Sequence, residues 1–182
     1  PVRLVINSSF AQKSEASLNS ILLKGPNILN CIFEILARWR MWPVAFVGDI
    51  TKMYHNVATG ELEGHVRRLL WRDYESSRCP DEYVFQTVTF GDRPAGCIVV
   101  SALRRTAEMF RSVDEKAADM IIRDTYMDDL VSGTQSKEAA IDVINHIQER
   151  AGKGGFKFKK FITAWTEEAS DTVESVLGIR WR

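Results

Sequence analysis

The chain has 182 residues, 45% of them hydrophobic, which suits one domain with a packed core. Its 24 Lys and Arg residues balance 24 Asp and Glu residues, so it lacks the overall positive charge of many nucleic-acid-binding proteins. It contains no apolar run of the roughly 18 residues that span a bilayer, no apolar signal sequence, and three cysteines without CxxC spacing. We therefore expect an intracellular protein that is not secreted and has no membrane segment, disulfide framework or zinc site.

The N-terminal part of the chain predicts a strand, a polar loop and a helix. Residues 2–6 (VRLVI) are typical of a strand, and residues 7–20 are rich in Ser, Lys and Glu, which favours a loop. After Gly25-Pro26, apolar residues recur at helical spacing until Pro43 ends the pattern. The expected buried side of this helix consists of Ile28, Leu29, Ile32, Phe33, Leu36 and Ala37.

The middle of the chain predicts three strands and a helix. Residues 44–50 form a short apolar run, typical of a buried strand that carries Asp49 at its end. Two further strands are expected at residues 65–72 and 83–90, with turn-forming residues between them. Pro94 is expected to begin a helix that continues through Phe110. Its expected buried side consists of Ile98, Val99, Ala102, Leu103 and Phe110.

The last third predicts a hairpin with acidic residues at its tip. Residues 120–124 and 130–132 are typical of two strands that meet at Tyr126-Met-Asp-Asp129. A helix over residues 136–151 is expected next, with Ser136 as its N-cap.

Two final strands, near residues 156–163 and 175–181, complete the pattern. Strands and helices mixed in this order predict an α+β fold, in which helices cover one antiparallel sheet.

Three acidic residues are the candidate functional site. Asp49 ends a predicted buried strand, and Asp128 and Asp129 occupy the predicted hairpin tip. Carboxylates that converge require a cation, and hard oxygen ligands suit Mg²⁺. Two such ions about 4 Å apart support in-line phosphoryl transfer, the chemistry of polymerases and nucleases.

Ordinary structural roles remain open for the same residues. Asp-Asp in a turn often serves only turn geometry, and Asp49 alone could be a helix cap or an ion-pair partner. Basic residues cluster at residues 67–72, at Arg104-Arg105 and at residues 155–161, where a solvated surface is the default interpretation. The order of strand-borne Asp, glycine-containing segment before a helix, and Tyr-x-Asp-Asp hairpin favours the functional interpretation.

Six sequence motifs follow one another in a recognisable order. They are Arg3–Asn7 with Ser17–Asn19 and Leu23–Asn27, then Pro43–Tyr54, Phe90–Cys97, Tyr126–Asp129, Gly155–Lys160 and Leu177–Trp181. Over nearly the whole chain, these motifs resemble the opening fingers motifs, motifs A to D and the primer grip of reverse transcriptases. The residues within the motifs are similar to those of the BEL/Pao class of long-terminal-repeat retrotransposons.

The resemblance implies a polymerase palm, with a ferredoxin-like or RRM-like core of antiparallel sheet backed by helices, and partial fingers. Residues 1–42 and about 55–90 are then fingers-like, residues 43–54 and 91–175 belong to the palm, and residues 176–182 begin the primer grip. The thumb, RNase H, protease and integrase domains of such an element are expected to be absent from this chain.

The resemblance also implies a metal site. Asp49 and Asp128 are then the principal ligands of two Mg²⁺ ions, for which Mn²⁺ is a possible substitute. Asp129 completes the acidic cluster, and the backbone carbonyl of Ile50 is a further ligand. Lys160 matches the lysine that protonates the leaving pyrophosphate, with Lys157 and Lys159 as close competitors.

Further residues match substrate-binding positions of the family. Arg3 matches an arginine that grips the triphosphate, a task suited to a planar charged fork. Tyr54 matches an aromatic gate against the ribose 2′-hydroxyl, which implies a preference for deoxynucleotides. The remaining matches are Phe90 and Gly91 near the nascent base pair, Tyr126 and Met127 beside the substrate, and Leu177, Gly178 and Trp181 in the primer grip. A core position for Tyr54 or Trp181, and a surface position for Arg3 or Lys160, are the ordinary alternatives.

The chain departs from the family at two places. Asn7 stands where these elements usually carry Asp, and Asp92-Arg-Pro-Ala-Gly-Cys97 stands where many relatives carry a Ser-Pro pair. The first hypothesis is an RNA-directed DNA polymerase that adds dNTP to a primer on an RNA or DNA template. Its setting is a cytoplasmic particle or the nucleus, alongside the other polyprotein domains. A catalytically inactive, domesticated remnant that acts as a scaffold or nucleic-acid-binding module is the alternative, and another palm-type nucleotidyltransferase or cyclase ranks last.

Overall fold

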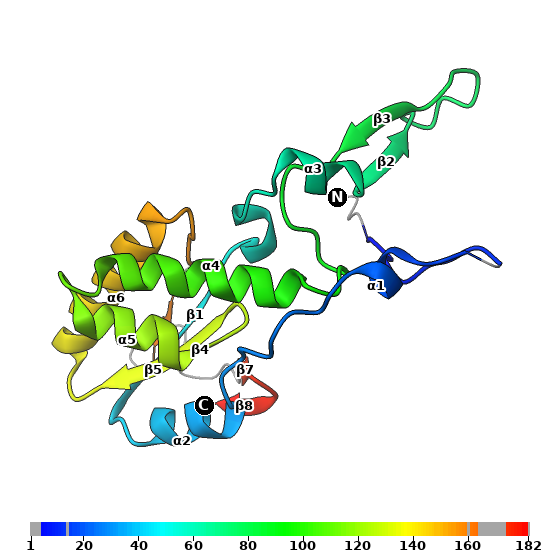
Figure 1. Cartoon of the computed structure of the whole chain (residues 1–182). Helices are drawn as coiled ribbons and strands as arrows, with labels where there is room; N and C mark the ends of the chain where they lie inside the picture. The colour runs from blue at the N-terminus through cyan, green and yellow to red at the C-terminus, as the bar shows by residue number, and fades with distance from the viewer. Residues whose placement is uncertain (1–4, 14, 160, 164–173, 182) are drawn as a thin grey trace. The chain divides into compact units, whose positions relative to one another are not determined.

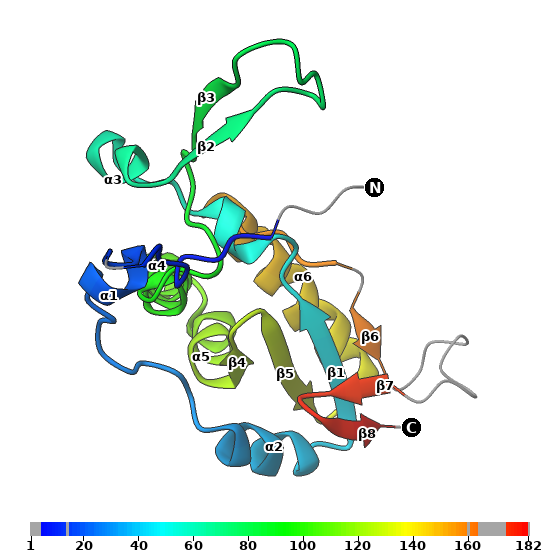
Figure 2. The ribbon, with the colours of Figure 1, turned by 90° about the vertical axis from the view of Figure 1, so that its right-hand side faces the viewer.

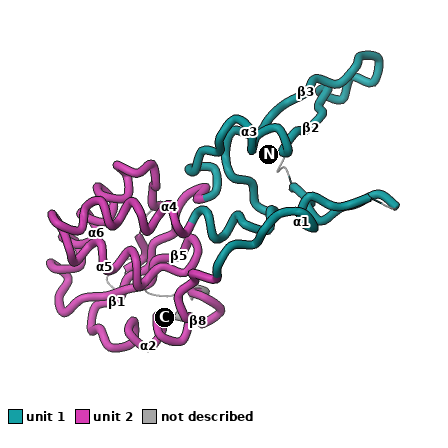
Figure 3. The backbone as a smooth tube through the Cα atoms, in the orientation of Figure 1, with its two compact units in different colours: residues 1–26, 54–99 teal, residues 27–53, 100–182 magenta. Residues whose placement is uncertain are grey.

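A computed structural model describes residues 5–13, 15–159, 161–163 and 174–181. The chain divides into two compact units, which are residues 1–26 with 54–99 and residues 27–53 with 100–182 (Figure 3). In chain order the elements are α1 Leu18–Ile21, α2 Ile32–Arg40, β1 Val44–Asp49, η1 Met53–Asn56, α3 Glu61–His65, β2 Arg68–Trp71, β3 Asp81–Val84, α4 Ala95–Phe110, α5 Glu115–Asp124, β4 Thr125–Tyr126, β5 Asp129–Thr134, α6 Lys137–Lys153, β6 Ile162–Thr163, β7 Glu174–Val176 and β8 Ile179–Trp181 (Figure 1). In the described part of the chain, no helix has the length and apolar character needed to cross a bilayer.

The second unit is built around an antiparallel sheet with the strand order β4-β5-β1-β6 (Figure 2). Strands β1 and β5 pair along their whole length, from Val44 opposite Thr134 to Asp49 opposite Asp129. The predicted α+β fold with a helix-covered antiparallel sheet is therefore confirmed at this level.

Apolar side chains on alternate positions of β1 and β5 pack the sheet on both faces. Val47 and Val131 face each other across the two strands and share one face, which α2 and the β7–β8 hairpin cover. The buried cluster on this face consists of Ile35, Trp39, Val47, Val131 and Val176. Helix α6 lies on the opposite side of the sheet from the β7–β8 hairpin (Figure 2), and it buries Val143 and Ile147.

The first unit consists of short elements around a buried polar centre. A two-stranded sheet forms from β2 and β3, with Leu69 opposite Tyr83, and a single bridge joins Ala58 to Thr87. Ser8, Arg67, Thr89 and Asp92 are all buried here, and their side chains are hydrogen-bonded to one another through the Asp92 carboxylate. The N-terminal segment is thus held against the loop that precedes α4.

Three predicted elements are confirmed nearly to the residue. They are β1, α4 and α6, and the Ser136 hydroxyl caps α6 by accepting from the Ala139 amide, 3.2 Å away. The last predicted strand corresponds to β7 and β8, which form a hairpin. Of the strand predicted over residues 156–163, the described residues contain β6 and an isolated bridge at Phe158, and residue 160 lies outside them.

The strand predicted for residues 120–124 is wrong, because these residues form the last half of helix α5. Asp114 caps this helix by accepting from the Ala117 amide, and Ala117 and Ile121 lie on its buried side. The acidic hairpin itself is present, but its first strand is only β4.

The helix after Gly25-Pro26 begins later than predicted and buries another face. In α2 the buried residues are Ile35 and Trp39, whereas Phe33 is 84% exposed.

Val5 and Ile6 are not in a strand, and the rest of the predicted N-terminal strand lies outside the described residues. In the first unit, the predicted strands over residues 65–72 and 83–90 are shorter, and the second begins earlier, at Asp81.

Candidate functional site

The register of β1 and β5 brings two of the three predicted acids together. Asp49 and Asp129 are directly opposite each other at the ends of the two strands. The Ile50 amide donates to the Asp128 carbonyl over 2.8 Å, so the neighbouring Asp49 and Asp129 form the pair without ladder hydrogen bonds, in which opposing side chains are closest. Both share the sheet face of Val47 and Val131, since side chains two apart on a strand point the same way.

A two-residue turn places the third acid beside them. Tyr126 of β4 pairs with Asp129, so Met127 and Asp128 form the turn of a tight hairpin. Met127 has φ of 54°, a backbone conformation that residues other than glycine adopt at a cost of about 1 kcal/mol or more. Asp128 is exposed, and Tyr126 packs against the cluster around Val47 and Val131. The predicted residues Tyr126, Met127, Asp128 and Asp129 therefore lie in one hairpin.

Negative charge accumulates at this corner of the sheet. Burial, followed by the charges of Asp128 and Asp49, raises the pKa of Asp129 above its ordinary value. Lys159 partly compensates, because its Nζ lies 2.9 Å from Oδ1 of Asp49. The same hydrogen bond, followed by the charge of Asp49, raises the pKa of Lys159. The corner thus holds three acids together with a cation that stabilises them.

The donor set suits Mg²⁺, which prefers carboxylate oxygens and retains several waters. Asp49, Asp128 and Asp129 supply such oxygens from adjacent backbone positions. Burial, and after it the charges of Asp128 and Asp49, raise the pKa of Asp129, and a bound metal would offset both effects. As the side chains stand, however, no three Asp, Glu, His or Cys groups among the described residues are arranged to hold an ion. Side-chain rotation at this corner is therefore part of any metal binding. The Ile50 carbonyl as a ligand stays a prediction.

Of the described lysines in this segment, Lys159 lies next to the acids, and the sequence left it as a competitor of Lys160. Lys159 is held by two contacts, since its amide donates to the Asp49 carbonyl over 2.8 Å and its ammonium pairs with the Asp49 carboxylate. The third candidate, Lys157, is exposed, and its carbonyl accepts from the Thr51 amide. Lys160 lies outside the described residues, as does Arg3, the predicted triphosphate-binding arginine.

Three predicted substrate-binding residues are neighbours in the first unit. The rings of Tyr54 and Phe90 meet edge to face with centroids 5.6 Å apart, and His55 also packs on Phe90 at 5.4 Å. Gly91 has φ of 104°, and a Cβ there would lie 2.7 Å from the Ile6 carbonyl oxygen. The segment that approaches Gly91 closely is the chain's own N-terminal segment, and the place of Phe90 and Gly91 near a nascent base pair stays a prediction.

The Asp92 carboxylate organises the motif that contains it, a role that the sequence did not indicate. It accepts from Ser8 Oγ at 2.6 Å, Arg67 Nε at 2.5 Å and Thr89 Oγ1 at 2.9 Å. Burial alone would raise the pKa of Asp92, but these hydrogen bonds and the Arg67 charge hold the pKa below its ordinary value. No local sequence pattern signals this role, because Ser8 and Arg67 are 84 and 25 residues away from Asp92 in the chain.

The predicted primer-grip residues occupy the β7–β8 hairpin of the second unit. Val176 pairs with Ile179, so Leu177 and Gly178 form a two-residue turn, and their φ values of 47° and 83° are those of a type I′ turn. Leu177 packs against the cluster around Val47 and Val131, on the sheet face that also carries the acids. The backbone of Trp181 pairs with that of Glu174.

Compared with models of known protein families and with curated proteins, the chain shows no match to any of them. The geometry of the acidic corner and the order of the sequence motifs are therefore the features of this chain that bear on its function.

Proposed function

We propose that this chain is the fingers-and-palm core of a reverse transcriptase, which transfers a deoxynucleotide to a primer 3′-hydroxyl on an RNA or DNA template. The observation that carries the proposal is the register that sets Asp49 opposite Asp129, with Asp128 in the adjoining turn. The order of the six motifs supports a polymerase of the BEL/Pao type over a nuclease. In that setting the protein acts inside the cell with the other domains of a retrotransposon polyprotein.

The acids are proposed to hold two Mg²⁺ ions, which when bound lower the pKa of the primer hydroxyl and neutralise charge on the triphosphate. Asp49 and Asp128 are the principal ligands in this proposal, and Asp129 completes the negative field. The rigid β1–β5 pairing fixes their backbones, so little reorganisation is needed when the substrate arrives. Lys159 holds the Asp49 carboxylate in place through their ion pair before metal binds.

The aromatic pair of the first unit is proposed to contact the incoming nucleotide. Phe90 is 41% exposed and supports the Tyr54 ring from the side. A tyrosine held in this way presents a flat, fixed surface to a sugar, which is the basis for expecting deoxynucleotides to be preferred over ribonucleotides. Replacing Tyr54 by Ala is expected to reduce that preference while leaving metal binding unchanged.

The test is primer extension on an RNA template with dNTP and Mg²⁺, together with Mn²⁺ binding followed by electron paramagnetic resonance. The substitutions Asp49→Asn and Asp128→Asn should each abolish extension and weaken Mn²⁺ binding at least tenfold. The matched control is Asp142→Asn, because Asp142 is 72% exposed on α6 and should leave both readouts unchanged. Unchanged primer extension in either Asp49→Asn or Asp128→Asn would refute the assignment of these residues as metal ligands.

The inactive-remnant alternative is favoured by one observation, the ion pair of Lys159 with Asp49, since a lysine already neutralises this carboxylate. Under this alternative the chain binds nucleic acid or other proteins without chemistry. It predicts that Mn²⁺ does not compete with Lys159 and that no nucleotide is incorporated with the wild-type chain. Saturable Mn²⁺ binding that Asp49→Asn removes excludes it.

A further inference from the structure

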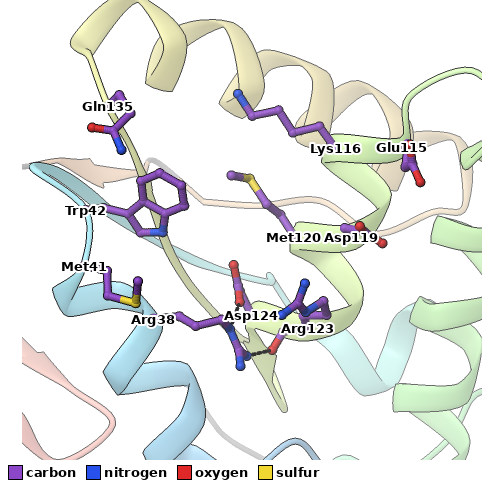
Figure 4. Close-up of a pocket in the computed structure, with 10 residues that line it drawn as sticks. All are labelled: Arg38, Met41, Trp42, Glu115, Lys116, Asp119, Met120, Arg123, Asp124 and Gln135. Atoms are coloured by element: carbon purple, nitrogen blue, oxygen red, sulfur yellow. Dashed lines mark hydrogen bonds and ion pairs between the residues drawn. The ribbon is translucent and has the colours of Figure 1, made fainter.

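A pocket in the second unit lies at the end of the sheet away from the acidic corner. It has a volume of about 590 Å³, within the range of roughly 300–1,000 Å³ typical of small-molecule sites. Its lining comes from α2, the turn after it, one side of α5 and the residue after β5, and consists of Arg38, Met41, Trp42, Glu115, Lys116, Asp119, Met120, Arg123, Asp124 and Gln135 (Figure 4). Gln135 follows the last residue of β5 and Asp129 is its first, which places the two residues roughly 20 Å apart along the sheet. This pocket is therefore distinct from the candidate metal site.

The walls of the pocket favour a flat aromatic group. The Trp42 indole and the Met120 side chain lie on opposite sides of it (Figure 4), and Met41 adds a second thioether at its edge. Indole faces stack on aromatic rings, and thioether–aromatic contacts contribute about 0.3–1.5 kcal/mol each. Met41 is 77% exposed. A ligand that covered this side chain would remove its apolar surface from water.

The floor of the pocket is polar but already satisfied. Arg38 Nε donates to Asp124 Oδ1 at 2.9 Å, and Ser132 Oγ donates to Asp124 Oδ2 at 2.7 Å. The Arg38 guanidinium also donates to the Arg123 carbonyl. Since these groups satisfy one another, the floor is rigid and leaves no unpaired charge for a ligand to meet.

The rim is positively charged once the internal ion pairs are taken into account. Asp124 pairs with Arg38, and Asp119 pairs with Arg111 at 2.6 Å. Lys116 and Arg123 have no ion-pair partner among the described residues, and Glu115 is the one lining acid there that has none either. Lys116 and Arg123 are two turns apart on α5 with Met120 between them, so both cations flank the apolar wall.

We propose that this pocket binds a small planar aromatic anion. The ring system lies between Trp42 and the methionines, and its anionic group pairs with Lys116 and Arg123 at the rim. The inference does not depend on the proposed polymerase function, because it uses none of the three acids.

The test uses 8-anilinonaphthalene-1-sulfonate, an aromatic sulfonate whose fluorescence rises when it leaves water, and N-phenyl-1-naphthylamine, which has the same rings without the charge. The wild-type chain should bind one sulfonate probe saturably. The double variant Lys116→Gln, Arg123→Gln should raise its Kd about tenfold, since each exposed charge pair contributes up to about 1 kcal/mol. The uncharged probe should bind the double variant as it binds the wild type, and Met41→Ala should weaken both probes.

A matched pair of exposed cations that do not line the pocket, Lys24 and Arg105, provides the control. The variant Lys24→Gln, Arg105→Gln should bind the sulfonate probe like the wild type. An equal loss in this control, an unchanged Kd in the pocket variant, or binding that does not saturate at one probe per chain overturns the proposal. Location is checked by the indole N–H signal of Trp42 in ¹⁵N-correlated NMR spectra, identified with Trp42→Phe. Fluorescence enhancement without a shift of that signal also overturns it.

Discussion

Asp129 lies where the carboxylates of the second unit converge, and the cost of that position is measurable. Like charges directly opposite in an antiparallel pair are unfavourable by about 0.2–1 kcal/mol. In metal-free buffer at pH 7, Asp129→Asn should therefore raise the melting temperature by about 1–3 °C, as the penalty of ionising a partly buried Asp129 beside Asp128 and Asp49 is removed. The measurement is thermal unfolding with EDTA present, and Asp142→Asn should show no such gain.

The gain should disappear in acid. The folded state raises the pKa of Asp129 above the ordinary value of 3.8, so it holds its proton more tightly than the unfolded chain does. Stability from this group is then complete below the ordinary pKa and decreases as pH rises through the folded-state pKa. A stabilisation by Asp129→Asn that is as large at pH 3 as at pH 7, or a loss of stability at pH 7, would contradict this explanation.

Asp92 is the opposite case, an acid whose ionised form the fold stabilises. Arg67 and Asp92 are both buried and bonded to each other, and removing one partner of such a pair typically costs about 3–5 kcal/mol. We expect Asp92→Asn to lower the free energy of unfolding by about 3 kcal/mol at pH 7, measured by urea denaturation. Asp73→Asn, which removes an exposed acid 3.5 Å from Arg78, should cost less than about 0.5 kcal/mol.

The pH dependence of the Asp92 network follows from the same contacts. Its pKa is depressed in the folded state despite burial, so its contribution is present above the ordinary value of 3.8 and is lost as pH falls through the folded-state pKa. The difference between wild type and Asp92→Asn should therefore shrink below pH 3.8. A difference that is constant from pH 7 to pH 3 would indicate that packing, and not the charge pair, holds the segment around Ser8.

At the scale of elements, two glycines give opposite expectations for the same substitution. A Cβ on Gly133 of β5 would lie 2.7 Å from the Val44 carbonyl oxygen and 2.5 Å from Cβ of Trp42, so Gly133→Ala should destabilise by about 1–3 kcal/mol. Gly152 of α6 has no atom within 4 Å of that position, and Gly152→Ala should stabilise by about 0.5–1 kcal/mol through helix propensity. Urea unfolding of the two variants measures both signs, and equal effects would mean that the close approach of β5 to Trp42 relaxes.

The elements that the sequence predicted well are those whose local signals agree. Ser136 caps α6, and its apolar residues recur at one helical spacing, so local chemistry and packing favour the same helix. The run Met120-Ile-Ile122 fits a strand or a buried helix equally well. The Asp114 cap and packing against α6 favour the helix, α5. In α2, too, Phe33 and Leu36 fit a helical face, but tertiary contacts selected the face of Ile35 and Trp39.

The candidate site divides in the same way. That Asp49 ends a strand was predictable from the apolar run before it, and that Asp128 and Asp129 are at a tip was predictable from Tyr-x-Asp-Asp. The pairing of Asp49 with Lys159 was not, since three lysines lie within residues 157–160 and no sequence pattern indicates which of them faces Asp49. The partners of Asp92 are likewise up to 84 residues away in sequence, beyond any local pattern.

At the scale of the whole molecule, the net charge is zero, and several acidic and basic side chains also neutralise one another in ion pairs. Two arginines of the basic cluster predicted at residues 67–72 are not free cations, because Arg67 is buried on Asp92 and Arg68 pairs with Glu82. Among the described residues, Lys159 is likewise engaged by Asp49. At these positions a nucleic acid would thus meet fewer available cations than the sequence suggests. Under the proposed function, divalent ions held by the acidic corner would add to the attraction for phosphates.

Divalent ions should consequently stabilise the whole chain if the acids bind them. A ligand that binds only the folded state adds RT ln(1 + [L]/Kd) to the free energy of unfolding, about 1.4 kcal/mol at ten times Kd. Added Mg²⁺ should therefore raise the melting temperature of the wild-type chain by roughly 3–5 °C at saturating levels, with ionic strength held constant by KCl. Asp49→Asn should lose this shift and Asp142→Asn should keep it. An identical shift in Asp49→Asn would locate the ion elsewhere, and because the assay needs neither template nor primer, it tests the acids separately from polymerase activity.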